Sequence, residues 1–135
     1  MDIIDVAAAL VFRQCKLLIT QRPAGSHLAG LWEFPGGKLE SNESFEQCLI
    51  RELQEELGIE VSVGQLLESV VHSYTEKTVQ LKFFQCRWVN REPRPLGCQD
   101  FRWITSGELG HYQFPAADAT LLKRLQKDQA LWSSE

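Results

Sequence analysis

Apolar residues gather in short runs that have the length of β-strands. Two such runs, at 6–12 and 16–21, are separated by three residues and predict a β-hairpin. Further strand-like runs follow at 66–72, 79–89 and 101–104. The run at 79–89 is rich in Val, Phe and Trp, the residue types that strands favour.

The segment 44–57 follows the period of a helix instead. Its apolar stripe needs a core to cover it and consists of Cys48, Leu49, Leu53 and Leu57. Ser44, with Gln47 three residues later, has the pattern of a capping-box start. Gly58 is a typical residue for the end of a helix. We therefore predict a helix at about 44–57.

A second helical stripe follows Pro115, a residue type that is frequent in the first turn of a helix. Its apolar members are Ala117, Leu121, Leu122 and Leu125. Strands covered on both sides by helices predict an α/β protein built as a three-layer α/β/α sandwich. The 135 residues contain no repeat or long linker, so we expect a single domain over 1–135.

The first helix carries more negative charge than stability favours. Glu52, Glu55 and Glu56 share one helical face, where like charges repel by a few tenths of a kcal/mol per pair. Glu43 lies just before the helix, and Arg51 can pair with Glu55, but one cation cannot neutralise four carboxylates. We therefore expect a bound cation. Carboxylate oxygens suit Mg²⁺ or Mn²⁺ better than zinc.

The composition excludes several other classes of protein. The hydrophobic share of 44% and the charged share of 24% are ordinary for a soluble globular protein. No apolar stretch could span a membrane and the first residues lack the basic region of a signal peptide, so we expect a cytoplasmic protein. A net charge of -4 disfavours polymeric nucleic acid. Widely spaced cysteines predict reduced, mostly buried thiols, at Cys15, Cys48, Cys86 and Cys98.

The acidic helix belongs to a longer motif. Gly37, five residues, Glu43, seven residues and then RELQEELGI at 51–59 match every fixed position of the Nudix box, so the chain resembles the Nudix hydrolase family. The flanks QRP at 21–23, LWEFPGGK at 31–38 and FPAAD at 114–118 are similar to the bacterial MutT branch. Members of that branch sanitise nucleotide pools by hydrolysing oxidised dGTP.

The resemblance implies a fold, a reaction and a set of metal ligands. The fold is a mixed β-sheet within a three-layer α/β/α sandwich. The reaction converts a nucleoside triphosphate to the monophosphate and pyrophosphate, with water attacking an inner phosphorus and Mg²⁺, or Mn²⁺ in its place, on the phosphate oxygens. The implied ligands are Glu52 and Glu56, joined by Glu55, by Glu43 through water and by the Gly37 carbonyl. Arg51 is expected to orient a glutamate, and the protein to act as a monomer.

One position departs from the MutT pattern. Related proteins have a further glutamate about six residues before the tryptophan of the late strand, and here that position is Gly97. Asp100 is close in sequence, but a loop shift would be needed for it to reach the metal. We therefore expect a glutamate of the box, Glu52 first, to serve as the base or to hold the attacking water.

The residues that resemble the nucleotide contacts of MutT are Arg22, His27, Phe34, Lys38 and Asp118. Phe34 could stack on a base or belong to the core, and Lys38 could contact phosphate or be solvated. MutT has asparagine where this chain has Asp118, and an ionised Asp only accepts hydrogen bonds. That would suit the amino group of cytosine, as in the CTP pyrophosphohydrolase branch, whereas protonation would restore a donor. The substrate stays open between 8-oxo-dGTP and a cytidine nucleotide.

Two readings of other classes are weaker. A Nudix domain that senses nucleotides without hydrolysis would be expected to lose carboxylates of the box, and this chain keeps all four. A nucleic-acid module is disfavoured because Trp88, Trp103 and Trp132 are not set among clustered Lys or Arg.

Overall fold

The structure is a computed structural model that describes residues 3–133. Its strands are β1 Ile3–Arg13, β2 Lys16–Gln21, β3 Trp32–Glu33, β4 Gly36–Lys38, β5 Glu60–Ser73, β6 Thr78–Asn90 and β7 Asp100–Ile104. Its helices are α1 Phe45–Leu57, α2 Ala119–Lys127 and α3 Ala130–Ser133, with 3-10 turns η1 Ser106–His111 and η2 Ala116–Asp118. None of these helices has both the length and the apolar character needed to cross a membrane, within residues 3–133.

The strands form a mixed sheet, as predicted. Its order is β3-β2-β1-β6-β5, with β4 paired to β1 and β7 paired to β2 beside this path. β1 and β6 run parallel, with Ile3 opposite Thr78 and Phe12 opposite Arg87. The other pairs are antiparallel. The parallel pair is central, which is why β1 is buried on both faces along most of its length.

The predicted hairpin joins β1 and β2 through a two-residue turn. Arg13 pairs with Lys16, and Gln14 and Cys15 between them have φ values of 52° and 63°. Two successive left-handed residues are typical of the hairpin turn whose twist matches the strands. All four cysteines are free; Cys15 is exposed in this turn, whereas Cys48 and Cys86 are buried.

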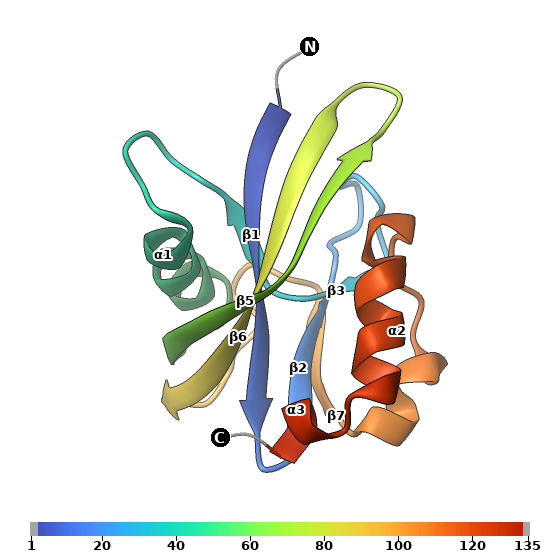
Figure 1. Ribbon diagram of the computed structural model, residues 1–135. Helices are drawn as coiled ribbons and strands as arrows, with labels where there is room; N and C mark the ends of the chain where they lie inside the picture. The colour runs from blue at the N-terminus through green and yellow to red at the C-terminus, as the bar shows by residue number, and fades with distance from the viewer. Residues whose placement is uncertain (1–2, 134–135) are drawn as a thin grey trace.

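The two helical layers cover opposite faces of the sheet (Figure 1). On one face Ala7, Ala9 and Val11 of β1 pack in a core with Leu53 and Leu57 of α1. On the other face the alternate residues of β1 join a second core with α2 and α3; its members include Leu10, Phe12, Leu121, Leu125 and Trp132. The side chains of a strand alternate between the faces of a sheet, so one strand supplies both cores. The predicted three-layer arrangement is confirmed.

Helix α1 has the ends that its sequence predicts. The Ser44 side chain accepts from the Gln47 N–H and the Gln47 side chain accepts from the Ser44 N–H, which completes the capping box. Gly58 has a φ of 67° and ends the helix in the left-handed conformation. The N–H groups of Leu96 and Gly97 then bind the Glu56 carbonyl, at 3.0 Å each. The segment before β7 therefore satisfies a carbonyl that the helix leaves unpaired.

The second helix begins later than predicted. Pro115 is followed by the 3-10 turn η2, in which the Asp118 N–H binds the Pro115 carbonyl at 3.0 Å, and α2 begins only at Ala119. Asp118 is therefore held in a tight turn and not within an α-helix. The predicted apolar stripe of this segment is confirmed at Ala117, Leu121 and Leu125, which are buried.

The sheet also extends beyond the strands that the sequence predicts. β5 begins at Glu60, well before the expected start at 66, and register shifts at Val63/Leu66 and Leu66/Glu68 interrupt its alternation. A bulge moves side chains to the other face, so the pattern of the first half of β5 does not read as a strand. β3, β4, η1 and α3 were not predicted; at two or three residues, β3 and β4 are too short to show a period.

Replacing Trp132 by Ala is expected to lower the free energy of unfolding by about 3–5 kcal/mol. The Trp132 side chain is 3% exposed, its ring meets Phe12 edge-on at 5.5 Å, and its indole N–H donates to the Leu125 carbonyl. Urea denaturation measures the change. Ser133→Ala, at the exposed neighbouring position, is the control and should change the free energy by less than about 0.5 kcal/mol. Equal stability of both variants would mean that α3 does not close the core in solution.

Candidate active site

Arg51 of α1 gathers three of the four acidic side chains that the sequence singles out. Its Nε and Nη2 donate to the two carboxylate oxygens of Glu43 at 2.7 and 2.9 Å. Its Nη1 donates to Glu52 at 2.9 Å and to Glu55 at 3.0 Å, and Nη2 also reaches the Lys38 carbonyl at 3.1 Å. The expected pair with Glu55 is present, and the same guanidinium also holds Glu43 and Glu52.

This guanidinium sets the charge state of its partners. Its hydrogen bonds hold the pKa of Glu43 at about 2, well below the ordinary value of 4.5. Burial raises the pKa of Glu52, against the opposing effect of Arg51. The Glu55 side chain is 55% exposed, so solvent screens its charge. In the absence of a bound metal ion, Arg51 therefore offsets part of the negative charge of these glutamates.

Glu56 lies apart from this network and points toward β4. Its carboxylate accepts from the Gly36 N–H at 3.2 Å. Burial, followed by the nearby charges of Glu33 and Glu52, raises the pKa of Glu56 to about 8. The carboxyl group is therefore largely protonated at neutral pH in the absence of a cation.

The two glycines of β4 allow the sheet and the acidic helix to approach each other. A Cβ at Gly37 would lie 2.4 Å from the Glu52 carboxyl carbon, and a Cβ at Gly36 would lie 2.0 Å from the Ala7 carbonyl oxygen. A side chain at Gly36 would clash with backbone, and a side chain at Gly37 would displace the Glu52 carboxylate. The Gly37 carbonyl faces α1, where it accepts from the Cys48 thiol at 3.4 Å.

Glu52, Glu56 and the Gly37 carbonyl are therefore the donors that this region offers to a cation. All three donate oxygen, which fits a hard divalent ion. Within residues 3–133 no three His, Cys, Asp or Glu side chains are already arranged around a common point as metal ligands. Arg51 holds Glu43, Glu52 and Glu55 in hydrogen bonds instead.

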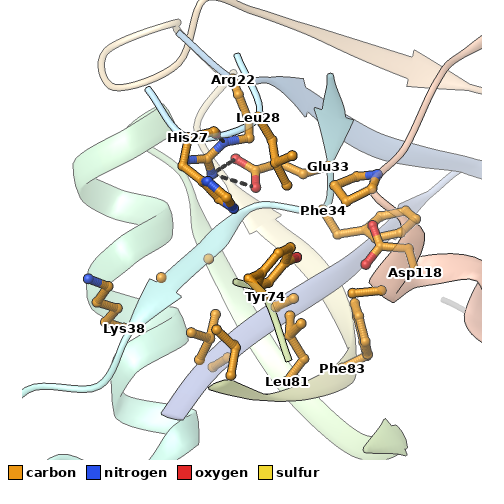
Figure 2. Close-up of a pocket in the computed structure, with 18 of the residues that line it drawn as sticks. Arg22, His27, Leu28, Glu33, Phe34, Lys38, Tyr74, Leu81, Phe83 and Asp118 are labelled. Atoms are coloured by element: carbon orange, nitrogen blue, oxygen red, sulfur yellow. Dashed lines mark hydrogen bonds and ion pairs between the residues drawn. The ribbon is translucent and has the colours of Figure 1, made fainter. Parts of the chain in front are cut away.

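A cavity of about 270 Å³ lies beside this region (Figure 2). All five residues predicted to contact a nucleotide line it, and so does Gly37; the five are Arg22, His27, Phe34, Lys38 and Asp118. The acidic residues of α1 do not line it. Strand β4 thus lies between an acidic region on α1 and a cavity on the face of the sheet that α2 covers. The contribution of these residues to binding stays a prediction.

The side chains of the cavity differ in how freely they could meet a ligand. Arg22 donates to both carboxylate oxygens of Glu33 at 3.0 and 3.2 Å and to the His27 carbonyl, so protein groups already hold its guanidinium. Phe34 is 4% exposed and stacks on Phe114 with centroids 5.2 Å apart, so it belongs to the core as well as to the cavity wall. Lys38 lies at the margin of the cavity (Figure 2).

Asp118 is the buried polar residue of this cavity. It is 5% exposed, and within residues 3–133 its carboxylate has no hydrogen-bond partner. Burial, and then the charge of Glu33, raises the pKa of Asp118 to about 7. The carboxyl group opens into the cavity and no protein group binds it, so it is available to a ligand that supplies a partner.

Among the polar lining residues, the sequence did not indicate Glu33, Tyr74 and Lys77. Glu33 lies within the MutT-like segment 31–38, and its carboxylate pairs with Arg22. Burial raises the pKa of Glu33 despite that pair. Tyr74 and Lys77 belong to the turn between β5 and β6, where no pattern in the sequence indicated a site.

Comparison with known proteins shows the family. A family model described as NUDIX domain matches residues 7–124. The chain belongs to the Nudix family. It is thus a hydrolase that acts on pyrophosphate bonds, in a family that in general uses divalent metal ions.

Two curated Nudix relatives and one solved structure illustrate the likeness. The CTP pyrophosphohydrolase of Escherichia coli K12 is 39% identical over 123 residues, which are 91% of each chain. The 8-oxo-dGTP diphosphatase of Proteus vulgaris is 48% identical over 82 residues, 60% of this chain and 73% of that protein. The crystal structure of a MutT protein from Methanosarcina mazei Go1 superposes with a TM-score of 0.83 at 26% identity, over 93% of this chain and 94% of that one.

The Nudix box of this chain lies next to a position without a carboxylate, Gly97. Its backbone packs on Glu56, since a Cβ there would lie 3.3 Å from the Glu56 Cα. The nearby carboxylate of Asp100 is already bound, to the Arg102 guanidinium at 2.6 Å and to the Phe101 N–H at 2.8 Å. Asp100 is therefore held within its own strand, β7.

Replacing Glu56 by Gln is expected to stabilise the protein in the absence of divalent ions. The folded state binds more protons than the unfolded state between pH 4.5 and about 8, the ordinary and the raised pKa of Glu56. Stability from this group is thus fully present below pH 4.5 and is lost as the pH rises toward about 8. Urea unfolding in EDTA should show Glu56→Gln more stable than the parent by on the order of 2 kcal/mol at about pH 8, and by less at about pH 5.

Glu46→Gln is the matched control, because Glu46 is exposed in the first turn of the same helix. This variant should keep the pH dependence of the parent. A Glu56→Gln protein that follows the parent at both pH values would show that Glu56 does not carry a buried proton.

Proposed function

We propose that this Nudix hydrolase is a Mg²⁺-dependent nucleoside triphosphate pyrophosphohydrolase that prefers 8-oxo-dGTP. It converts the triphosphate to the monophosphate and pyrophosphate. One observation carries the proposal: β4 joins an oxygen-lined acidic region on α1 to a cavity in which Asp118 is buried without a partner. The first part suits metal-bound phosphates and the second suits a base.

The acidic region takes the phosphate end of the substrate in this proposal. Glu52, Glu56 and the Gly37 carbonyl hold Mg²⁺, Glu55 joins them, and Glu43 acts through water. When bound, a divalent cation supplies positive charge to the phosphate oxygens and makes a coordinated water more acidic. Arg51 keeps the carboxylates in place, since it already binds Glu43, Glu52 and Glu55.

Glu52 holds and deprotonates the attacking water. Its side chain is 20% exposed and lies against Gly37, next to both Arg51 and the donors of β4. Asp100 is the competing carboxylate, but Arg102 and the Phe101 N–H bind it. Gly97 brings no carboxylate of its own, so a box glutamate is the remaining choice.

The cavity takes the base. The pKa of Asp118 is about 7, so its protonated and ionised forms are both populated near neutral pH. The protonated form can donate to a base carbonyl and the ionised form accepts from an N–H, and an oxidised guanine edge presents both groups. This supports 8-oxo-dGTP, and the relative in Proteus vulgaris carries the name of that activity.

The alternative substrate is CTP or a modified dCTP. A carboxylate such as Asp118 pairs well with the N4 amino group of cytosine. The relative from Escherichia coli that covers 91% of this chain is named a CTP pyrophosphohydrolase. A non-catalytic nucleotide sensor is a second alternative, which the retained carboxylates at 43, 52, 55 and 56 disfavour.

A panel of 8-oxo-dGTP, dGTP, CTP and dCTP tests the choice of substrate. We expect pyrophosphate release with Mg²⁺ and the highest kcat/KM for 8-oxo-dGTP, because its O6 and N7–H offer an acceptor and a donor to the two forms of Asp118, whereas O6 and N7 of dGTP are both acceptors. A preference for cytidine nucleotides by more than about tenfold, or 1.4 kcal/mol, would replace the first choice by the second. Binding without pyrophosphate release would favour the hypothesis of a non-catalytic nucleotide sensor.

Glu52→Gln is expected to lower kcat by about 100-fold or more, because the variant cannot take a proton from water. Asp100→Asn should keep kcat within about threefold of the parent, as its carboxylate is bound within β7. Pyrophosphate release is measured with Mg²⁺ and again in EDTA, where it should vanish. Thermal denaturation checks that both variants fold. Near-normal turnover of Glu52→Gln together with loss of turnover in Asp100→Asn would move the base to Asp100.

A further inference from the structure

The turn between β5 and β6 places Tyr74 within the cavity. The Tyr74 N–H donates to the Lys77 carbonyl at 2.7 Å, which closes the turn. The Tyr74 ring meets His72 edge-on with centroids 4.6 Å apart, and meets His27 edge-on at 4.9 Å. One histidine belongs to β5 and the other to the loop after β2. The phenol is therefore oriented by two segments that are distant in the sequence.

The hydroxyl group of Tyr74 points toward the side of the cavity that Asp118 occupies (Figure 2). The two groups do not bind each other, and within residues 3–133 neither side chain has a hydrogen-bond partner. Burial, and then the negative charge of Asp118, raise the pKa of Tyr74, so the two groups interact through space. A donor and an acceptor thus face one cavity, and both lack partners.

The rest of the cavity is suited to a flat, mostly apolar ligand. Leu81 and Phe83 of β6 and Phe34 line it with apolar surface. Its volume of about 270 Å³ lies just below the usual range for sites that hold whole small molecules. This space fits one heterocyclic base, whose edge would meet Tyr74 and Asp118.

We propose that Tyr74 is a specificity-determining residue whose hydroxyl donates to an acceptor on the base edge while Asp118 accepts from the N–H group beside it. The inference rests on the proposed nucleotide substrate and deepens it. A base edge that presents an acceptor next to a donor satisfies both residues. The O6 carbonyl and the N7–H of 8-oxoguanine form such an edge. The ring nitrogen N3 of cytosine, an acceptor, and its N4 amino group, a donor, form another. Unmodified guanine presents two acceptors, O6 and N7, on the same edge. Its N7 would face the Asp118 carboxylate, so this edge does not fit between the two residues and gains little from the Tyr74 hydroxyl.

Tyr74→Phe tests the proposal, because it removes the hydroxyl and keeps the ring between the two histidines. The matched control is Tyr112→Phe, since Tyr112 is the other tyrosine of the chain, packs against Trp32 and does not line the cavity. We expect Tyr74→Phe to lower kcat/KM for the preferred nucleotide by about tenfold, mainly through KM, and for dGTP by less than about twofold. Tyr112→Phe should change neither value.

Binding of the monophosphates 8-oxo-dGMP, dGMP and CMP, measured by calorimetry in EDTA, separates this inference from the proposed function. Weaker binding of 8-oxo-dGMP or CMP to Tyr74→Phe, with dGMP unchanged, supports the role of Tyr74 even if no triphosphate is hydrolysed. An unchanged preference between 8-oxo-dGMP or CMP and dGMP in Tyr74→Phe overturns the inference even if hydrolysis is normal. Failure of the parent to bind any of the three also overturns it. Thermal denaturation of both variants shows whether the fold is kept.

Discussion

The close approach of β4 to its two neighbours is the constraint on which this site depends. β4 pairs with β1 on one side, where Ala7 stands opposite Gly37, and touches α1 on the other through Glu52. A Cβ at Gly36 would clash with the β1 backbone and a Cβ at Gly37 would displace the Glu52 carboxylate, so glycine at both positions lets β4 pack closely against β1 and α1. This close packing places the acidic region of α1 on one side of β4 and the cavity on the other.

The distribution of charge follows from that arrangement. A helix with three glutamates on one face would repel itself, and Arg51 offsets this by binding Glu43, Glu52 and Glu55. Glu56 has no such cation and is buried beside β4, so its pKa rises to about 8. The protein therefore keeps an electrostatic strain in α1 that a cation would relieve. Sites that bind charged ligands commonly trade stability for function in this way.

The two ends of the site are built differently. Most of the acidic end lies on one helix, α1, whose caps at Ser44 and Gly58 fix its length and orientation; Glu43 precedes the helix and Gly37 belongs to β4. The cavity draws its side chains from separate segments: the loop after β2, the β5–β6 turn and the 3-10 turn η2, together with strands β1, β3, β4 and β6. Loops tolerate substitution better than helices do, so the loop residues of the cavity can vary more readily than the acidic helix.

The sequence by itself determined the features that depend on local spacing. The ends of α1, the hairpin of β1 and β2 and the acidic face of the helix follow from residues a few positions apart, because capping, turn geometry and helical faces are local. Only the tertiary structure decided what distant segments do together. Arg51 binds Glu43 eight positions away only because the chain before α1 folds back, and Tyr74 and Asp118 line the same cavity without contacting each other. Short strands such as β4 and the bulged start of β5 leave no period to detect, and a periodic pattern reports which face is buried but not which side chains converge.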